Sequence, residues 1–149
     1  MVRKIISHKG IRFIINYKEV NQIEYLPKNV FANTRYLVRY DPVEKCAIVD
    51  SGAPEWYKPL AALHELICCG RQYEEYVPGL VELYTDGHTL CKNHCWQIER
   101  YIIEIAGEHA RDYVLARREM FKSLLDYNLC GDDFREQVTK SLEMLQTRF

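Results

Sequence analysis

Three neighbouring residues, His64, Glu65 and Cys68, have the types and the spacing that zinc chemistry uses. His64 and Cys68 are four residues apart, so on a helix one turn brings their side chains together. Imidazole and thiolate are both zinc ligands. Glu65 lies about 100° further around such a helix, where it can reach a bound water without ligating the metal. The pattern favours a metal site with a carboxylate base, and zinc is the expected metal.

A catalytic zinc site needs a third protein ligand and an open position for water. A later helical stretch offers Glu104, Glu108 and His109, of which Glu108 and His109 are the candidate ligands. A structural interpretation competes with this hypothesis. In that interpretation, His64 is a hydrogen-bonded histidine inside an apolar helix face and Glu65 is a solvated charge.

Cysteine and histidine concentrate between positions 64 and 109, which hold four of the six cysteines and four of the five histidines. This concentration suggests a second arrangement, a structural zinc site formed by Cys69, Cys91, His94 and Cys95, with Cys68 as a substitute for Cys69. The chain lacks the usual pair of Cys-x-x-Cys knuckles, so buried thiols that pack as small apolar groups are the alternative. A third interpretation pairs Cys68 or Cys69 as a nucleophile with His64 or His94.

The order of elements around these residues resembles the compact zincin-type metallopeptidases, over roughly positions 54–113. In that family a His-Glu-x-x-His helix supplies two ligands and the base, and a later helix completes the site. The resemblance implies that His64 is the first ligand, Glu65 the general base, and Glu108 or His109 the third ligand. Cys68 stands where the family has its second histidine. Thiolate retains zinc but makes it a weaker Lewis acid, so the resemblance implies metal binding more directly than hydrolysis of a peptide or protein substrate.

The elements that position these residues follow from apolar periodicity. Short β-prone runs occupy residues 11–17, 36–40 and 46–49, and Ser7 to Gly10 is a turn that can join residues 5–6 to the next run. Residues 53–71 predict a helix, 80–84 a short strand, 91–129 a long helix with a break near Gly107, and 134–145 a last helix. Strands followed by helices predict an α+β fold in one domain, residues 1–149. We expect a small N-terminal antiparallel sheet packed on about three helices, including one long helix in the C-terminal half.

Composition narrows the function classes. The 149 residues are 48% hydrophobic and 28% charged, with a net charge of -1, which is typical of soluble globular proteins and does not favour nucleic acid or a membrane as partner. Without a signal peptide or a long apolar run we expect a cytoplasmic protein. Basic residues alternate with acidic ones in the long helical stretch and predict a solvated helix face; they are Arg111, Arg117, Arg118 and Lys122.

The alternative function is a non-catalytic interaction protein, whose helical C-terminal half binds a partner or a second copy through an exposed apolar patch.

Overall fold

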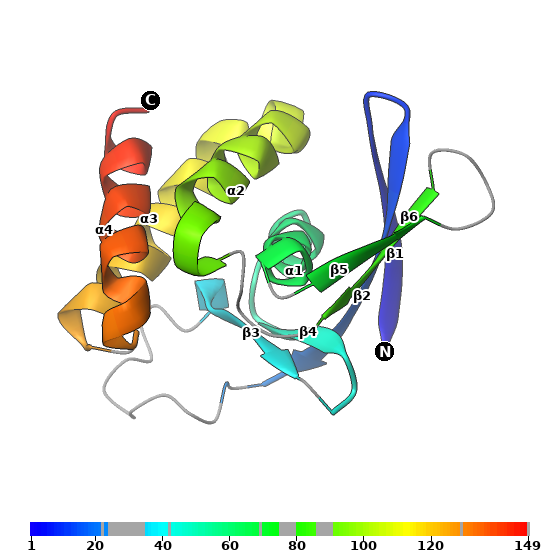
Figure 1. Ribbon diagram of the computed structural model, residues 1–149, viewed down its shortest axis with the longest axis horizontal. Helices are drawn as coiled ribbons and strands as arrows, with labels where there is room; N and C mark the ends of the chain where they lie inside the picture. Colours follow the sequence, from blue (N-terminus) through cyan, green and yellow to red (C-terminus); the bar gives the residue numbers. More distant parts are fainter. Residues whose placement is uncertain are drawn as a thin grey trace.

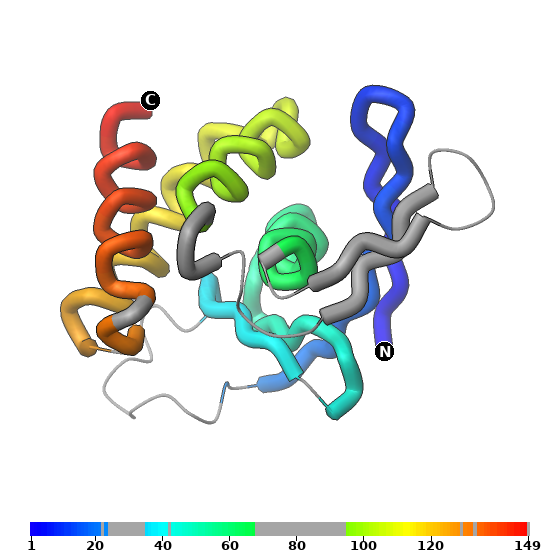
Figure 2. The backbone as a smooth tube through the Cα atoms, viewed as in Figure 1, coloured from blue at the N-terminus to red at the C-terminus, as the bar shows by residue number. Residues whose placement is uncertain are grey.

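The computed structural model describes residues 1–21, 23, 35–41, 43–68, 70–74, 80–85, 91–128 and 130–148 (Figure 2). For residues 68, 70–74, 80–85, 91–94 and 133 only the backbone is described. The architecture is α+β, as the order of elements in the sequence predicts.

Six strands in the described part of the chain form one sheet. They are β1 (Val2–His8), β2 (Ile11–Val20), β3 (Val38–Asp41), β4 (Cys46–Asp50), β5 (Gly70–Glu74) and β6 (Leu80–Thr85). The strand order is β3-β4-β2-β6-β5, and β1 also pairs with β2. β1 and β2 form the predicted hairpin. Its two-residue turn places Lys9 and Gly10 at φ 48° and 80°, the backbone that a tight hairpin connection requires.

The sheet is mixed, which differs from the antiparallel sheet that the sequence suggests. β2 pairs parallel with both β4 and β6, whereas β1–β2, β3–β4 and β5–β6 are antiparallel. Parallel neighbours need a crossover connection, and α1 (Tyr57–Cys68) lies between β4 and the β5–β6 pair in the chain. Periodicity within one strand does not report which way its neighbour runs, so this feature needed the tertiary structure.

Three further helices follow the sheet: α2 (Cys91–Ala106), α3 (Ala110–Asp126) and α4 (Asp132–Gln146). The 3-10 turn η2 (Gly107–His109) separates α2 from α3. Gly107 has φ 56°, a conformation that favours glycine and breaks the helix where the sequence predicts a break. The long predicted helix is therefore two helices joined by a tight turn.

α1 lies between the sheet and the other helices (Figure 1). It packs on strands β2 to β6 and against α2, and α4 packs on α2 and α3. The core joins these layers, with β2 contributing Phe13, Ile15 and Tyr17, and α1 contributing Leu63 and Leu66. Among the described residues no helix is long and apolar enough to cross a bilayer.

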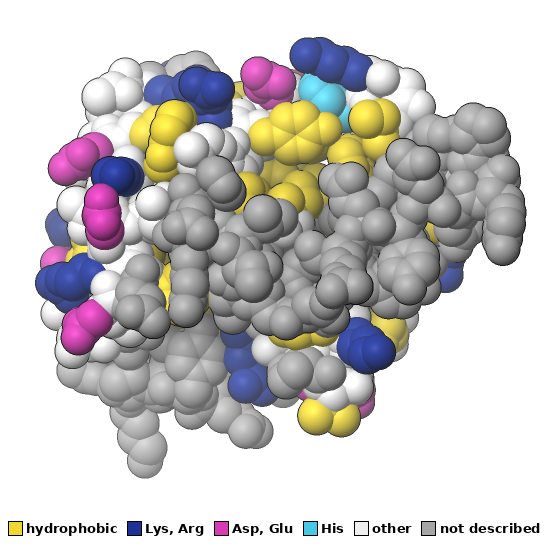
Figure 3. All heavy atoms as spheres, in the orientation of Figure 1, with side chains coloured by type: hydrophobic (Ala, Val, Ile, Leu, Met, Phe, Trp, Pro, Cys, Tyr) yellow, Lys and Arg dark blue, Asp and Glu magenta, His cyan; other side chains and the backbone are white. Residues whose placement is uncertain are grey.

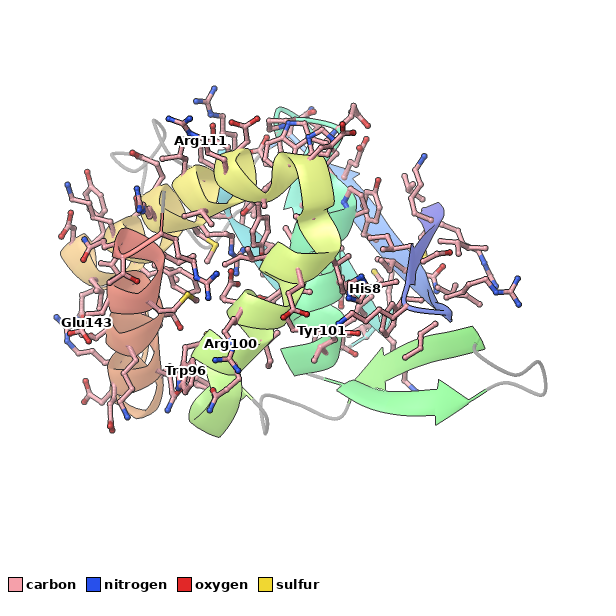
Figure 4. The ribbon with its side chains drawn as sticks, turned by 90° about the horizontal axis from the view of Figure 1, so that it is seen from above. His8, Trp96, Arg100, Tyr101, Arg111 and Glu143 are labelled. Atoms are coloured by element: carbon pink, nitrogen blue, oxygen red, sulfur yellow. The ribbon has the colours of Figure 1, made fainter. Side chains whose placement is uncertain are left out.

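α2 contacts different elements along its length, as Figure 4 shows. Tyr101 meets His8 of β1 edge-to-face, with ring centroids 5.8 Å apart. Nearer the start of the helix, the guanidinium of Arg100 lies 5.5 Å from the ring centroid of Trp96. α2 thus connects the hairpin with the helical layer, since it also packs against α3 and α4.

Candidate functional site

A buried histidine–glutamate pair joins α1 to α2. Nδ1 of His64 lies 2.6 Å from Oε1 of Glu99, and both side chains are almost fully buried. His64 is in the third turn of α1 and Glu99 in the middle of α2. The packing of these two helices therefore creates the pair.

Three more side chains complete what we call the Glu99 cluster: His64, Glu99, Arg117, Tyr113 and Tyr57. Nη2 of Arg117 lies 2.5 Å from Oε1 of Glu99, and the Tyr113 hydroxyl donates to Oε2 over 3.0 Å. Nη1 of Arg117 donates to the Tyr57 hydroxyl at 3.2 Å. Tyr57 in turn donates to a main-chain carbonyl oxygen, that of residue 36, at 2.5 Å. Both oxygens of the buried carboxylate are therefore occupied by donors or positive charge.

The cluster fixes the charge of its members. Burial alone would raise the pKa of Glu99, but Arg117 and His64 outweigh it and lower the pKa to about 2. Burial opposes the charge of Arg117, yet Glu99 raises the pKa of the guanidinium above its usual value. Burial raises the pKa of both Tyr57 and Tyr113, so these phenols stay protonated. Glu99 and Arg117 are consequently an ionised pair at any physiological pH.

A cavity of about 350 Å³ opens beside the cluster. Its apolar wall comes from β3, the residue before it, and the helices α3 and α4: Leu37, Val38, Met120, Phe121, Leu124, Phe134 and Val138. Its polar wall comprises Arg39, Tyr40, His64, Glu65 and Arg117, and the remaining lining residues are Cys95, Cys130 and Gly131. A mostly apolar cavity with a few convergent polar groups is the usual form of a small-molecule or active site.

Two residues singled out by the sequence, His64 and Glu65, line this cavity together. Glu65 is half-buried rather than freely solvated. Cys95, which the sequence suggested as a structural zinc ligand, is buried on α2 one turn before Glu99 and also lines the cavity. The structure therefore brings a histidine, a carboxylate and a thiol to one chamber.

Glu108 and His109 do not join them. Both lie in η2 on the surface, where the His109 ring stacks on Trp56 with centroids 5.2 Å apart and planes 6° from parallel. Trp56 directly precedes α1, so His64 is eight residues further along, about 12 Å by helical rise. The predicted third ligand is thus not supplied by either residue. Glu99 is the acidic residue of the later helices that reaches His64.

The other predicted ligands fall outside what the structure describes. Cys69 is not described, and for Cys68, Cys91 and His94 the description covers the helical backbone alone. Within the described residues there is no group of three His, Cys, Asp or Glu side chains that could hold a metal ion.

Sequence reasoning missed Glu99, Tyr57 and Tyr113, and it placed Arg117 wrongly on a solvated face. Arg117 is only 1% exposed. A signal was present, because both charges lie on the apolar stripes of their helices: Glu99 is one turn from Cys95 and Ile102, and Arg117 one turn from Tyr113 and Met120. A charge inside each of two apolar stripes indicates a buried pair, since an isolated buried charge is very costly.

Comparisons with protein-family models, with curated proteins and with solved structures found no match for this chain. The functional argument therefore depends on the geometry of the cavity and its residues.

Proposed function

We propose that the cavity at His64 is the active site of a zinc-dependent hydrolase, as the sequence resemblance implies. One observation carries the proposal: a buried histidine of α1 lines a cavity together with Glu65 while its Nδ1 lies against the carboxylate of Glu99. Histidines that ligate metals usually have their second ring nitrogen against a carboxylate or carbonyl, which fixes the tautomer and the ring orientation. Glu99 supplies that support here.

The described residues fit zinc at one ligand position and at the position of the base. Nε2 of His64 would be the ligand atom, since Nδ1 faces Glu99. Glu65 lines the same cavity and would accept the proton. Cys68, one turn further along α1, stays the proposed second ligand on the strength of its spacing in the sequence. The third ligand is unassigned.

Each residue then has a distinct task. When bound there, zinc would supply Lewis-acid activation of water near neutral pH. Glu65 would be the base that accepts a proton at its carboxylate and returns it to the leaving group. Glu99, kept ionised by Arg117, keeps the His64 proton on Nδ1 and so leaves Nε2 with its lone pair. The apolar wall limits the access of bulk water.

The competing function, an interaction protein, predicts an exposed apolar patch on the long helix. In the described part of α2 and α3 the apolar stripe is instead buried within the chain, through Ile102, Val114, Phe121 and others. On the face shown in Figure 3, acidic and basic side chains lie over the region of α4. Within α4, Lys140 pairs with Glu136 at 2.9 Å. The cavity is therefore the stronger basis for a function, and self-association stays a prediction.

The test is metal content by mass spectrometry on protein purified without a metal-binding tag. We expect about one zinc per chain in the wild type, in agreement with one tetrahedral site. His64→Ala should lose it, whereas His109→Ala, which removes a surface histidine, should keep it. Glu65→Gln should keep the zinc and lose hydrolysis of an unstructured protein substrate.

Two results would contradict the proposal. A folded wild type without zinc excludes this mechanism. Zinc that is retained in His64→Ala moves the metal to Cys91, His94 and Cys95 and makes it structural.

A further inference from the structure

A buried hydrogen-bond donor at the cavity wall has no acceptor among the described residues. Arg117 lines the cavity, and its two terminal nitrogens are occupied by Glu99, Tyr57 and the sulfur of Met120. Its Nε–H is buried and has no acceptor in the part of the chain that the structure describes. Buried donors in native proteins nearly always have a partner, because the alternative loses a hydrogen bond to water without replacement. An oxygen atom of a ligand would supply the missing acceptor.

The rest of the cavity indicates what that ligand carries. Phe121 and Leu124 of α3 and Phe134 and Val138 of α4 all line it, and none of these four side chains has a polar group. A volume of about 350 Å³ is at the lower end of small-molecule sites, which span roughly 300–1,000 Å³. A single aromatic or branched aliphatic group with a short polar attachment matches this size.

Charge balance favours a neutral ligand oxygen. Arg117 is already matched by the carboxylate of Glu99 at 2.5 Å. Glu65 and Arg39 line the cavity with opposite charges. A carboxylate ligand would add an uncompensated negative charge to an apolar chamber, which is unfavourable. A carbonyl oxygen accepts the hydrogen bond without that cost.

We propose that the cavity binds a bulky apolar group together with a neutral carbonyl oxygen that accepts from Nε–H of Arg117. As a substrate, such a ligand is an amide or peptide with an aromatic or branched aliphatic side chain beside the scissile bond. The assignment as substrate rests on the proposed hydrolase function, whereas the binding itself does not require cleavage.

A matched pair of probes tests whether the ligand's carbonyl oxygen contributes to binding. Acetophenone and α-methylstyrene have nearly the same shape, and they differ in that C=CH2 replaces the carbonyl C=O. Titration calorimetry on the wild-type protein should show acetophenone binding about tenfold more tightly, the effect of one hydrogen bond to a buried charged donor. Equal affinities, or no saturable binding of either probe, would overturn the proposal.

Substitutions in the apolar wall test the location. Val138→Trp should fill the cavity and weaken binding of N-acetyl-phenylalaninamide about tenfold or more, whereas Lys140→Trp adds the same ring on the exposed side of α4 and should leave it unchanged. Phe134→Ala should gain affinity for the larger N-acetyl-naphthylalaninamide, a result that misfolding cannot produce. Unchanged binding in both cavity variants overturns the location.

Cleavage is followed in the same samples by NMR, which separates the two proposals. Selective binding without cleavage or zinc supports the ligand assignment and contradicts the hydrolase. Zinc-dependent cleavage of an unstructured protein, with neither probe selectivity nor an effect of the cavity variants, supports the hydrolase and overturns the ligand assignment.

Discussion

Two histidine–glutamate pairs occur among the described residues, and they differ in almost everything except residue type. Glu108 and His109 are adjacent in the chain, Oε1 of Glu108 lies 3.6 Å from Nε2 of His109, and 88% and 39% of the two side chains are exposed. His64 and Glu99 are 35 positions apart, lie 2.6 Å from each other and are 3% and 0% exposed. The pair that is close in sequence is a surface contact, and the distant pair is the centre of a buried cluster.

The comparison shows that burial decides what a charged pair can do. Water screens the surface pair, so its charges affect stability very little. The buried pair has lost its hydrogen bonds to water, and Arg117, Tyr113 and Tyr57 supply hydrogen bonds within the cluster instead. Removal of any one member therefore leaves a buried polar group without its partner. A site with fixed charge and fixed orientation results.

Removal of the buried carboxylate should have the largest effect. Glu99→Gln keeps the shape but leaves the Arg117 charge without its counter-ion inside the core. We expect a loss of about 3–5 kcal/mol in the free energy of unfolding, measured by urea denaturation. Glu108→Gln is the matched control and should change it by less than about 0.5 kcal/mol. Similar, small effects of both substitutions would show that the buried cluster does not stabilise the fold.

The second-largest effect is expected from acid, which should reduce the contribution of Glu99 to the free energy of unfolding. The pKa of Glu99 falls from 4.5 to about 2 on folding, so the unfolded chain takes up a proton first as pH decreases. This contribution is fully present above about pH 5 and is lost between about pH 5 and pH 2, with a total of about 3 kcal/mol. Urea denaturation at pH 7, 5, 4 and 3 measures it. The gap between wild type and Glu99→Gln should narrow over this range, and a constant gap would refute the low pKa.

The smallest effect is expected at the surface pair. His109→Ala removes the stacking contact with Trp56 and the contact with Glu108, both largely in water. We expect a loss of at most about 1 kcal/mol in the free energy of unfolding, by the same urea assay. Glu99→Gln, measured in the same assay, gives the large effect with which this loss is compared. A loss comparable to that of Glu99→Gln would mean that the η2 region is as important to the fold as the cluster.

Much of the secondary structure was predictable from local pattern. The hairpin turn, the strands that became β2 to β4 and β6, the helices and the break at Gly107 all follow from apolar spacing and from glycine chemistry within a few residues. β5 (Gly70–Glu74) was missed because it is polar and gains its place by pairing with β6. The parallel pairing of β2 was missed because it depends on a crossover far away in the chain.

The residues of the candidate site also fall into two groups, those that the sequence predicted and those that it did not. His64 and Glu65 were predicted from their types and neighbours, and the structure places both at a cavity. The proposed partners Glu108 and His109 were chosen because they follow on a later helix, but that helix turns at Gly107 and carries them to the surface. Sequence distance along a helix does not report which face meets α1.

By itself, the sequence determined the local elements and the two residues of α1 that line the cavity, because both depend on contacts within one or two helical turns. Only the tertiary structure decided that Glu99 and Arg117 are buried together against His64, since each is an ordinary surface-type charge until a neighbouring helix excludes its water. The free energy of such a pair depends on packing among α1, α2 and α3, and no single segment of the chain encodes it.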